Sequence, residues 1–264
     1  MTKLYYILTL FLLFGCEKVI DVNLNEANPV VVIEGNMNYE SAKLEVHISK
    51  TGSYFETGSG EKVSDAKVIL EHHTGEMLEI TQISPGTYEK DELLLRPGNV
   101  YKLFAEVNGR EYEAESLLKE PIPIDSLGYT YYNGNNFFDG GYRVRLYFSD
   151  PIDEVNYYRI KVFKNGMLEN EVGDLIVFDD SGLDGKVIEV TLRGQPFTAG
   201  DRAEVHLITI DKKAYEYFSS LRELANTNPG SPAPANPISN FSNGALGYFS
   251  AWSYDSKDIL IKKR

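Results

Sequence analysis

Residues 101–109 read YKLFAEVNG, and they are the clearest indication of the fold class in the chain. Apolar and polar side chains alternate along them, which is the period of a strand with one buried face. The apolar positions are Tyr101, Leu103, Ala105 and Val107. The next pair, Asn108-Gly109, suits a type I′ turn because both residue types tolerate positive φ. The segment therefore predicts a β-hairpin.

The same alternation recurs upstream, at Leu44–Ile48 and Ala66–Leu70. Val30–Ile33 is a continuous apolar run, as expected for a strand that is central or buried on both faces. Turn-forming pairs separate these segments: Thr74-Gly75, Pro85-Gly86 and Pro97-Gly98. Short strands joined by frequent turns indicate a β-sandwich. We place this N-terminal β-sandwich domain at residues 29–120.

Pro121-Ile122-Pro123 interrupts the pattern, and we interpret it as a domain boundary because two of its residues lack a backbone donor. The second β domain would span residues 121–264. Its expected strands are Tyr142–Ser149, Asn156–Lys164, Val187–Arg193, Glu204–Ile210, Gly247–Ser253 and Ile259–Lys263, the last two returning to the second sheet. Asp211 suits a helix N-cap before a helix at about 212–225. The predicted fold is all-β, with two β-sandwich domains and one accessory helix.

The N-terminus has the organisation of a lipoprotein signal peptide at residues 1–15. Lys3 precedes the apolar run Leu4–Phe14, which is shorter than the roughly 20 residues of a membrane-spanning helix. Leu13-Phe14-Gly15-Cys16 resembles the lipobox of bacterial lipoproteins, in which cleavage precedes an acylated cysteine. We expect lipid attachment at Cys16, followed by a polar tether at residues 16–28. The alternative is an ordinary secretory signal with a chance cysteine.

Composition excludes several functions. The formal charge of −13 argues against a nucleic-acid partner, whose phosphates need basic patches. The acidity favours solubility, with an acidic site for a cationic ligand as the alternative. Cys16 is the only cysteine, so a disulfide within the chain and thiolate metal sites are excluded.

No residue pattern predicts catalysis. His72 and His73 would point to opposite faces of a strand, and His47 and His206 occupy polar strand positions. Residues 179–185 (DDSGLDG) lack the ligand spacing of a calcium loop and suit an acidic turn better. We therefore expect no enzyme activity, no metal site and no cofactor.

Residues 131–142 (YYNGNNFFDGGY) combine aromatic side chains with Asn, Gly and Asp, as recognition loops do. The predicted ligand-binding or partner-binding residues are Tyr131, Tyr132, Phe137, Phe138 and Tyr142. The alternative is a hairpin whose rings fold back onto the sandwich. Trp252 is expected to be a core anchor.

Ten segments of the chain carry a family resemblance: Glu17–Leu24 after the lipobox, Val31–Gly35, Val63–Val68, Gly86–Tyr88, Pro97–Leu103, Asp150-Pro151, Asn156–Tyr158, Asn236-Pro237, Ser239-Asn240 and Gly247–Phe249. Together they resemble one family from Bacteroidetes, the lipoproteins with domain of unknown function 4249 (DUF4249). The resemblance covers nearly the whole chain from Cys16, and its motifs are structural.

The resemblance implies a lipid-anchored protein of the outer membrane, on the cell surface or the periplasmic face. It also implies a first domain similar to immunoglobulin-like or transthyretin-like modules, and association with a TonB-dependent receptor. We therefore expect a non-enzymatic accessory or ligand-capture partner of such a receptor. The alternative is a structural or adhesive surface spacer.

Overall fold

The computed structural model describes residues 29–52, 60–135, 139–171, 174–225 and 236–263. The first half contains β1 (Val31–Asn38), β2 (Lys43–Lys50), β3 (Lys67–Glu71), β4 (Met77–Glu79), β5 (Thr81–Ser84), β6 (Thr87–Lys90), β7 (Asn99–Val107) and β8 (Arg110–Leu118). The second half contains β9 (Ile124–Tyr132), β10 (Gly141–Ser149), β11 (Tyr157–Lys164), β12 (Met167–Leu168), β13 (Ile176–Asp179), β14 (Val187–Thr191), β15 (Arg202–Ile210), helix α2 (Lys212–Ala225) and β16 (Leu246–Leu260).

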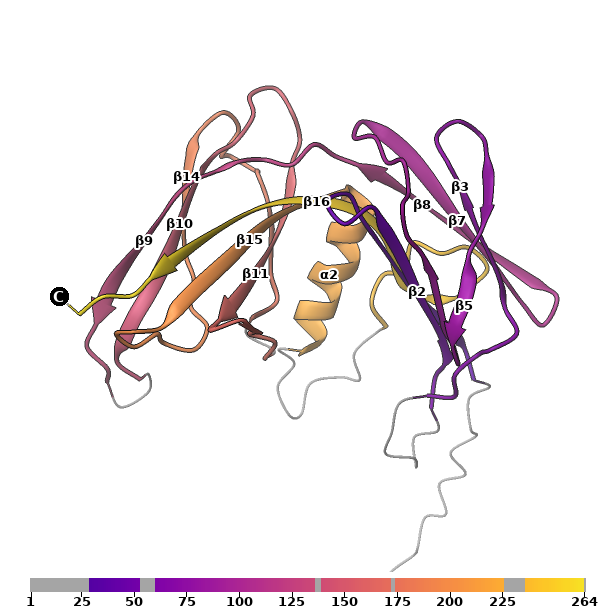
Figure 1. The fold of residues 1–264 in the computed structure, drawn as a ribbon, viewed down its shortest axis with the longest axis horizontal. Helices are drawn as coiled ribbons and strands as arrows, with labels where there is room; N and C mark the ends of the chain where they lie inside the picture. Colours follow the sequence, from indigo (N-terminus) through magenta and orange to yellow (C-terminus); the bar gives the residue numbers. More distant parts are fainter. Residues whose placement is uncertain (1–28, 53–59, 136–138, 172–173, 226–235, 264) are drawn as a thin grey trace, which may run out of the picture.

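The strands form two lobes that share one sheet (Figure 1). The shared sheet has nine strands in the order β12-β11-β15-β16-β1-β2-β6-β5, with β13 also paired to β11. In the first lobe it is joined by the sheet β4-β3-β7-β8, and in the second by β14-β10-β9. Each lobe encloses its own apolar core. The predicted all-β fold with sandwich domains and an accessory helix is confirmed.

The hairpin predicted from residues 101–109 is confirmed. Val107 pairs with Arg110, and the two residues between them, Asn108 and Gly109, have φ values of 51° and 74°. The four apolar side chains of β7 are buried in the first core. A two-residue turn with positive φ at both positions matches the right-handed twist of the flanking strands.

Strand β16 joins the lobes. Its first part pairs in parallel with β1, in the register Val32↔Leu246 to Asn38↔Trp252. Its second part pairs antiparallel with β15, from Thr209↔Ser253 to Arg202↔Leu260. The expectation that both C-terminal segments return to the second sheet is therefore wrong: they form one continuous strand, and Gly247–Trp252 lies beside β1.

The predicted boundary at residues 121–123 lies where the chain passes from β8 to β9. The core of the first lobe nevertheless includes side chains from the far end of the chain: Phe241, Ala245, Phe249 and Ala251. Residues 29–120 therefore do not enclose this core alone. The division into two domains at residue 121 stays a prediction.

Asp211 connects the helix to the first lobe. Its Oδ1 accepts a hydrogen bond from the Ala214 backbone N–H (2.8 Å), as an N-cap does. Its Oδ2 accepts from Ser116 Oγ (2.5 Å) and from the Leu117 N–H (2.9 Å) on β8. Burial raises the pKa of this carboxyl, while the three donors oppose that shift. One side chain thus begins α2 and fixes it against β8.

The signal peptide at residues 1–15 and the tether at residues 16–28, including Cys16, lie outside the described residues. Within the described ranges, no helix has the length and apolar character needed to cross a bilayer.

Candidate functional site

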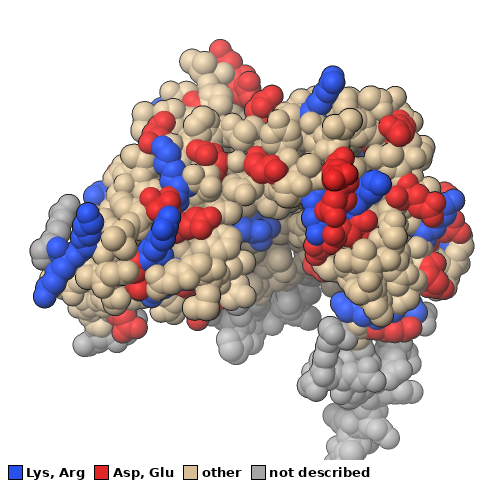
Figure 2. All heavy atoms as spheres, viewed as in Figure 1, with Lys and Arg blue, Asp and Glu red and all other residues tan. Residues whose placement is uncertain are grey.

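A cleft of about 440 Å³ opens on the face of the shared sheet that also carries α2. Strands β1, β2, β11, β15 and β16 all contribute to its lining, so both lobes form it. Figure 2 shows basic side chains in the hollow between the lobes, whereas acidic and basic side chains are mixed elsewhere on this surface. The cleft is therefore a concave surface with local positive charge on an acidic protein.

Three cations line the cleft: Lys43, Arg159 and Lys161. Lys43 Nζ is paired with Glu89 at 2.6 Å and lies 3.9 Å from Glu45. Arg159 and Lys161 project from the same face of β11 because they are two residues apart. Burial lowers the pKa of Lys161 to about 8, and the positive charge of Arg159 contributes to that shift. Lys161 Nζ lies 5.0 Å from the centroid of the Trp252 ring. Within the described residues, Lys161 forms no ion pair and no hydrogen bond.

Arg159 is held by aromatic side chains. Its Cζ lies 4.1 Å from the ring centroid of Phe218 on α2, and its guanidinium donates a hydrogen bond to the Tyr248 hydroxyl. Burial lowers the pKa of Arg159. No carboxylate of the described residues pairs with it. The cation–π contact and the hydroxyl fix the guanidinium without neutralising it.

Aromatic rings line the cleft beside these cations. His206 stacks on Tyr254 with ring centroids 4.4 Å apart and an interplanar angle of 10°. Phe163 lies 4.7 Å from His206, and Trp252 lies 5.8 Å from Tyr254, again between centroids. These rings come from β11, β15 and β16, which are adjacent in the sheet. They present a flat apolar surface next to two positive charges.

The carboxylates around the cleft already have other partners. Glu45 pairs with His47 Nε2 at 2.6 Å, and Glu204 pairs with His206 Nε2 at 2.7 Å. Glu40 accepts hydrogen bonds from the Tyr254 backbone N–H (2.8 Å) and from Asn38 Nδ2 (3.1 Å). These three carboxylates are thus bound to groups other than Arg159 and Lys161.

The amides on the β1 side are fixed in position. Asn36 Oδ1 accepts a hydrogen bond from the Tyr248 hydroxyl (3.0 Å). Asn38 Oδ1 accepts one from the Ser41 backbone N–H (2.6 Å). The arrangement of fixed amides, flat rings and two cations is typical of a site that binds a small molecule.

One part of the cleft has a pattern in the sequence, which did not enter the prediction of binding residues. Arg159, Lys161 and Phe163 alternate with Tyr158, Ile160 and Val162 along a predicted strand. Trp252, expected as a core anchor, is half-buried; it packs beside the cluster under α2 and also lines the cleft. The sequence does not show that β15 and β16 follow β11 in the sheet, which places Trp252 on the same face as Lys161.

The residues of the predicted aromatic site differ in exposure. Tyr131 and Tyr132, at the end of β9, are 54% and 46% exposed. Tyr142 is 7% exposed and belongs to the second core, where its ring contacts Tyr129 and Tyr131 at centroid distances of 5.5 and 5.1 Å. Tyr142 is thus a core residue, and its predicted role in binding stays a prediction. Phe137 and Phe138 lie outside the described residues.

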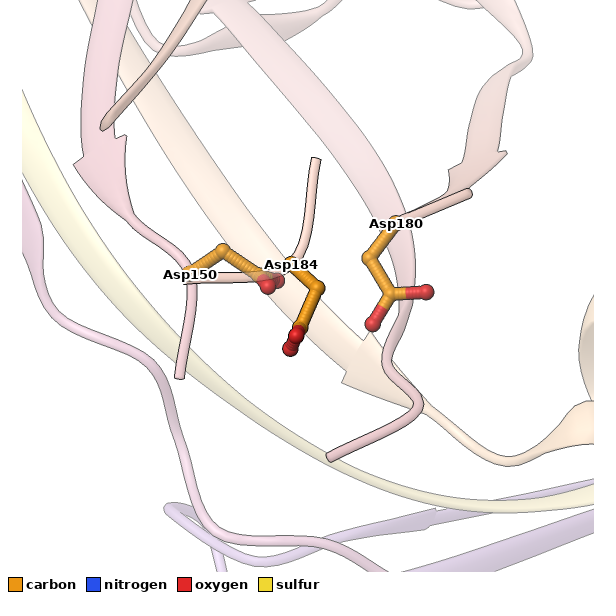
Figure 3. A group of neighbouring side chains, drawn as sticks. All are labelled: Asp150, Asp180 and Asp184. Carbon is orange, nitrogen blue, oxygen red and sulfur yellow. The ribbon is translucent and has the colours of Figure 1, made fainter. Parts of the chain in front are cut away.

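Three carboxylates converge between the β10–β11 and β13–β14 loops (Figure 3). Carboxylate oxygens of Asp150, Asp180 and Asp184 lie within 4.8 Å of one another. Each also accepts a hydrogen bond from the protein: Asp150 from the Gly185 N–H (3.2 Å), Asp180 from the Asn156 N–H (2.8 Å) and Asp184 from the Asp153 N–H (2.9 Å). Burial raises the pKa of Asp150, which also accepts from the Tyr158 hydroxyl. These bonds connect the two loops, which is a structural role.

His72 and His73 differ from their predicted arrangement. They follow the end of β3, so the strand geometry that would separate them does not apply. Their ring centroids are 4.1 Å apart, and both rings contact Tyr101. His72 is buried, and its Nε2 hydrogen-bonds the Leu94 carbonyl oxygen at 2.8 Å. The pair packs at the end of the first sandwich.

A second cavity of about 510 Å³ lies beside residues 117–123, where the lobes join. Its lining cation, Lys119, donates hydrogen bonds to the Val155 carbonyl and to Asn156 Oδ1, both at 2.8 Å. Lys119 is therefore already bound within the protein, unlike Lys161.

The sequence profile of the domain of unknown function DUF4249 matches residues 17–258. The chain belongs to the DUF4249 family. The family resemblance predicted from the sequence is thereby confirmed. None of the curated proteins matches the chain significantly.

Two solved structures show weak similarity to this DUF4249 chain. The chicken CNTN1 FN1–FN3 domains have 10% sequence identity, with 90% of this chain and 68% of that chain covered and a TM-score of 0.24. The selenomethionine-substituted chicken interferon gamma receptor alpha chain has 10% identity, with 69% of this chain and 90% of that chain covered and a TM-score of 0.22.

Proposed function

We propose that this DUF4249 protein is a non-enzymatic capture protein, anchored by lipid to the outer membrane, that holds a small ligand for a TonB-dependent receptor. One observation carries the proposal: two cations that have no acidic partner among the described residues lie beside flat rings in a cleft of about 440 Å³. Pockets for small molecules span roughly 300–1,000 Å³ and combine apolar walls with a few polar groups. The cleft has both the size and the composition of such a pocket.

The receptor partnership is tested by affinity purification of the full-length protein from outer membranes solubilised in mild detergent. A TonB-dependent receptor should co-purify in near-stoichiometric amount after cross-linking. A variant with Tyr131→Ser and Tyr132→Ser tests the exposed rings at the end of β9, and Lys90→Ser in the other lobe is its control. Recovery of the protein without any receptor, with and without cross-linker, would contradict the partnership.

The anchor is tested by Cys16→Ala. Because the peptidase recognises the modified thiol, this variant should remain an unlipidated precursor that keeps residues 1–15. Asn23→Ala, in the tether, should be processed normally. Mass spectrometry of the mature N-terminus and detergent partitioning measure both effects. A Cys16→Ala protein of mature size in the detergent phase would show that the anchor lies elsewhere.

A surface spacer is the second candidate. The observation in its favour is β16, whose 15 residues hydrogen-bond to strands of both lobes and join them through one sheet. A spacer has no need of unpaired cations in a cleft, so the measurements of ligand binding described next separate the two functions.

A further inference from the structure

We propose that the cleft binds an organic monoanion whose carboxylate lies between Arg159 and Lys161 and whose ring lies against Trp252. This inference rests on the proposed capture function and adds the chemical class of the ligand to it. It assigns a role to each part of the cleft: charge recognition to β11, ring stacking to β16 and hydroxyl or amide recognition to the Asn36 side.

The charge of the ligand follows from the fact that no carboxylate of the described residues pairs with Arg159 or Lys161. Desolvation makes an isolated cation unfavourable, and proteins normally place a carboxylate beside it. Here the nearby carboxylates bind other groups, and the described residues offer none to Lys161. The acids in the segments outside the described residues are Glu17, Asp21, Glu26 and Glu56. A ligand carboxylate would supply the missing negative charge through charge-assisted hydrogen bonds.

A single negative charge fits better than a phosphate dianion. The chain carries a formal charge of −13, and Glu34 is close enough to raise the pKa of Tyr248, which lines the cleft, and of Tyr217. Two cations balance a monoanion and the surrounding acidic potential, whereas a dianion would be repelled more strongly. Inorganic phosphate should therefore compete poorly.

From the aromatic surface of the cleft we infer that the ligand contains a ring. Trp252 is half-buried, with Lys161 on its face, and the stacked pair of His206 and Tyr254 continues the surface. A ligand with a flat ring can stack there while its carboxylate reaches Lys161 Nζ. Two kinds of molecule share this chemistry, an acidic sugar and an aromatic acid, and the experiment distinguishes them.

Trp252 is the only tryptophan in the chain, so its fluorescence reports on the cleft directly. The full-length protein is titrated with glucuronate and with benzoate, each paired with its uncharged counterpart, glucose and benzyl alcohol. At least one acid should change the Trp252 emission saturably, with an affinity about tenfold or more above that of its counterpart. Binding of glucuronate would identify the ligand as an acidic sugar, and binding of benzoate would identify it as an aromatic acid. Equal binding of an acid and its counterpart, no binding by either acid, or equal binding of phosphate would overturn the inference.

Lys161→Met removes the charge but keeps the length of the stem over Trp252. It should weaken binding of the acid about tenfold or more, while Lys90→Met, outside the cleft, should have no effect. Unchanged far-UV circular dichroism establishes folding; if Lys161→Met does not fold, Lys161→Gln replaces it. Unchanged affinity in the folded variant would overturn the inference. Binding of a neutral ring that alters Trp252 emission would leave the capture function standing and remove only the charge assignment.

Discussion

Replacing Gly247 with alanine should lower the free energy of unfolding by roughly 3–5 kcal/mol, one of the largest effects that a single methyl group can have in this protein. Gly247 lies near the start of β16, opposite Ile33 of β1, with φ of +97°. A Cβ atom there would lie 2.0 Å from the Ile33 carbonyl oxygen and 2.8 Å from its carbonyl carbon. The two parallel strands would have to separate where the shared sheet joins the lobes.

Gly200 provides the matched control. Its φ of +101° is close to that of Gly247, but a Cβ at Gly200 would meet nothing within 4 Å. Gly200→Ala should therefore report backbone strain alone, about 1–2 kcal/mol. Urea unfolding of both variants, followed by circular dichroism, measures the difference. Equal losses would mean that the close approach of β1 and β16 contributes nothing beyond the strained φ.

Local features of the fold could be predicted because they depend on neighbouring residues. Asn108-Gly109 requires only that two residues accept positive φ, and Asp211 requires only a free N–H three residues later. The pairing of β1 with β16 depends on segments about 210 residues apart in sequence, such as Val32 and Leu246. No local period encodes that contact, so the prediction for Gly247–Ser253 is wrong, whereas Ile259 does pair with β15 of the second half.

The site was harder to predict than the fold for the same reason. Alternation along β11 separates Arg159 and Lys161 from Tyr158 and Ile160, but it does not say which strands lie opposite them. The shared sheet decides that, because β15 and β16 bring His206, Trp252 and Tyr254 to the same face. The binding site at residues 131–142 was predicted from composition alone, and composition does not show that Tyr142 belongs to the core.

The isolated fragment of residues 29–120 should not fold cooperatively, although the predicted boundary at Pro121 would make it a domain. Without the end of the chain, its core lacks Phe241, which is 7% exposed in the intact protein, and Phe249, which is fully buried. Burial of one large apolar side chain contributes about 1.5–3 kcal/mol, and a domain is stable by only about 5–15 kcal/mol. The fragment also leaves β1 as an unpaired edge from Val32 to Asn38.

A peptide of residues 239–253, added in trans, should restore the fold because it supplies both rings and the parallel partner of β1. Circular dichroism and thermal unfolding of the fragment, alone and with excess peptide, test this. The control peptide carries Phe249→Ala; a Cβ on neighbouring Gly35 would lie 3.0 Å from the Phe249 ring, so the contact that this substitution removes is close. A cooperative transition of the fragment alone, at a temperature near that of the intact protein, would show that residues 29–120 are a complete domain. Rescue by the native peptide but not by the control would show instead that one core is closed by both ends of the chain, and that β16 must be in place before the first lobe is stable.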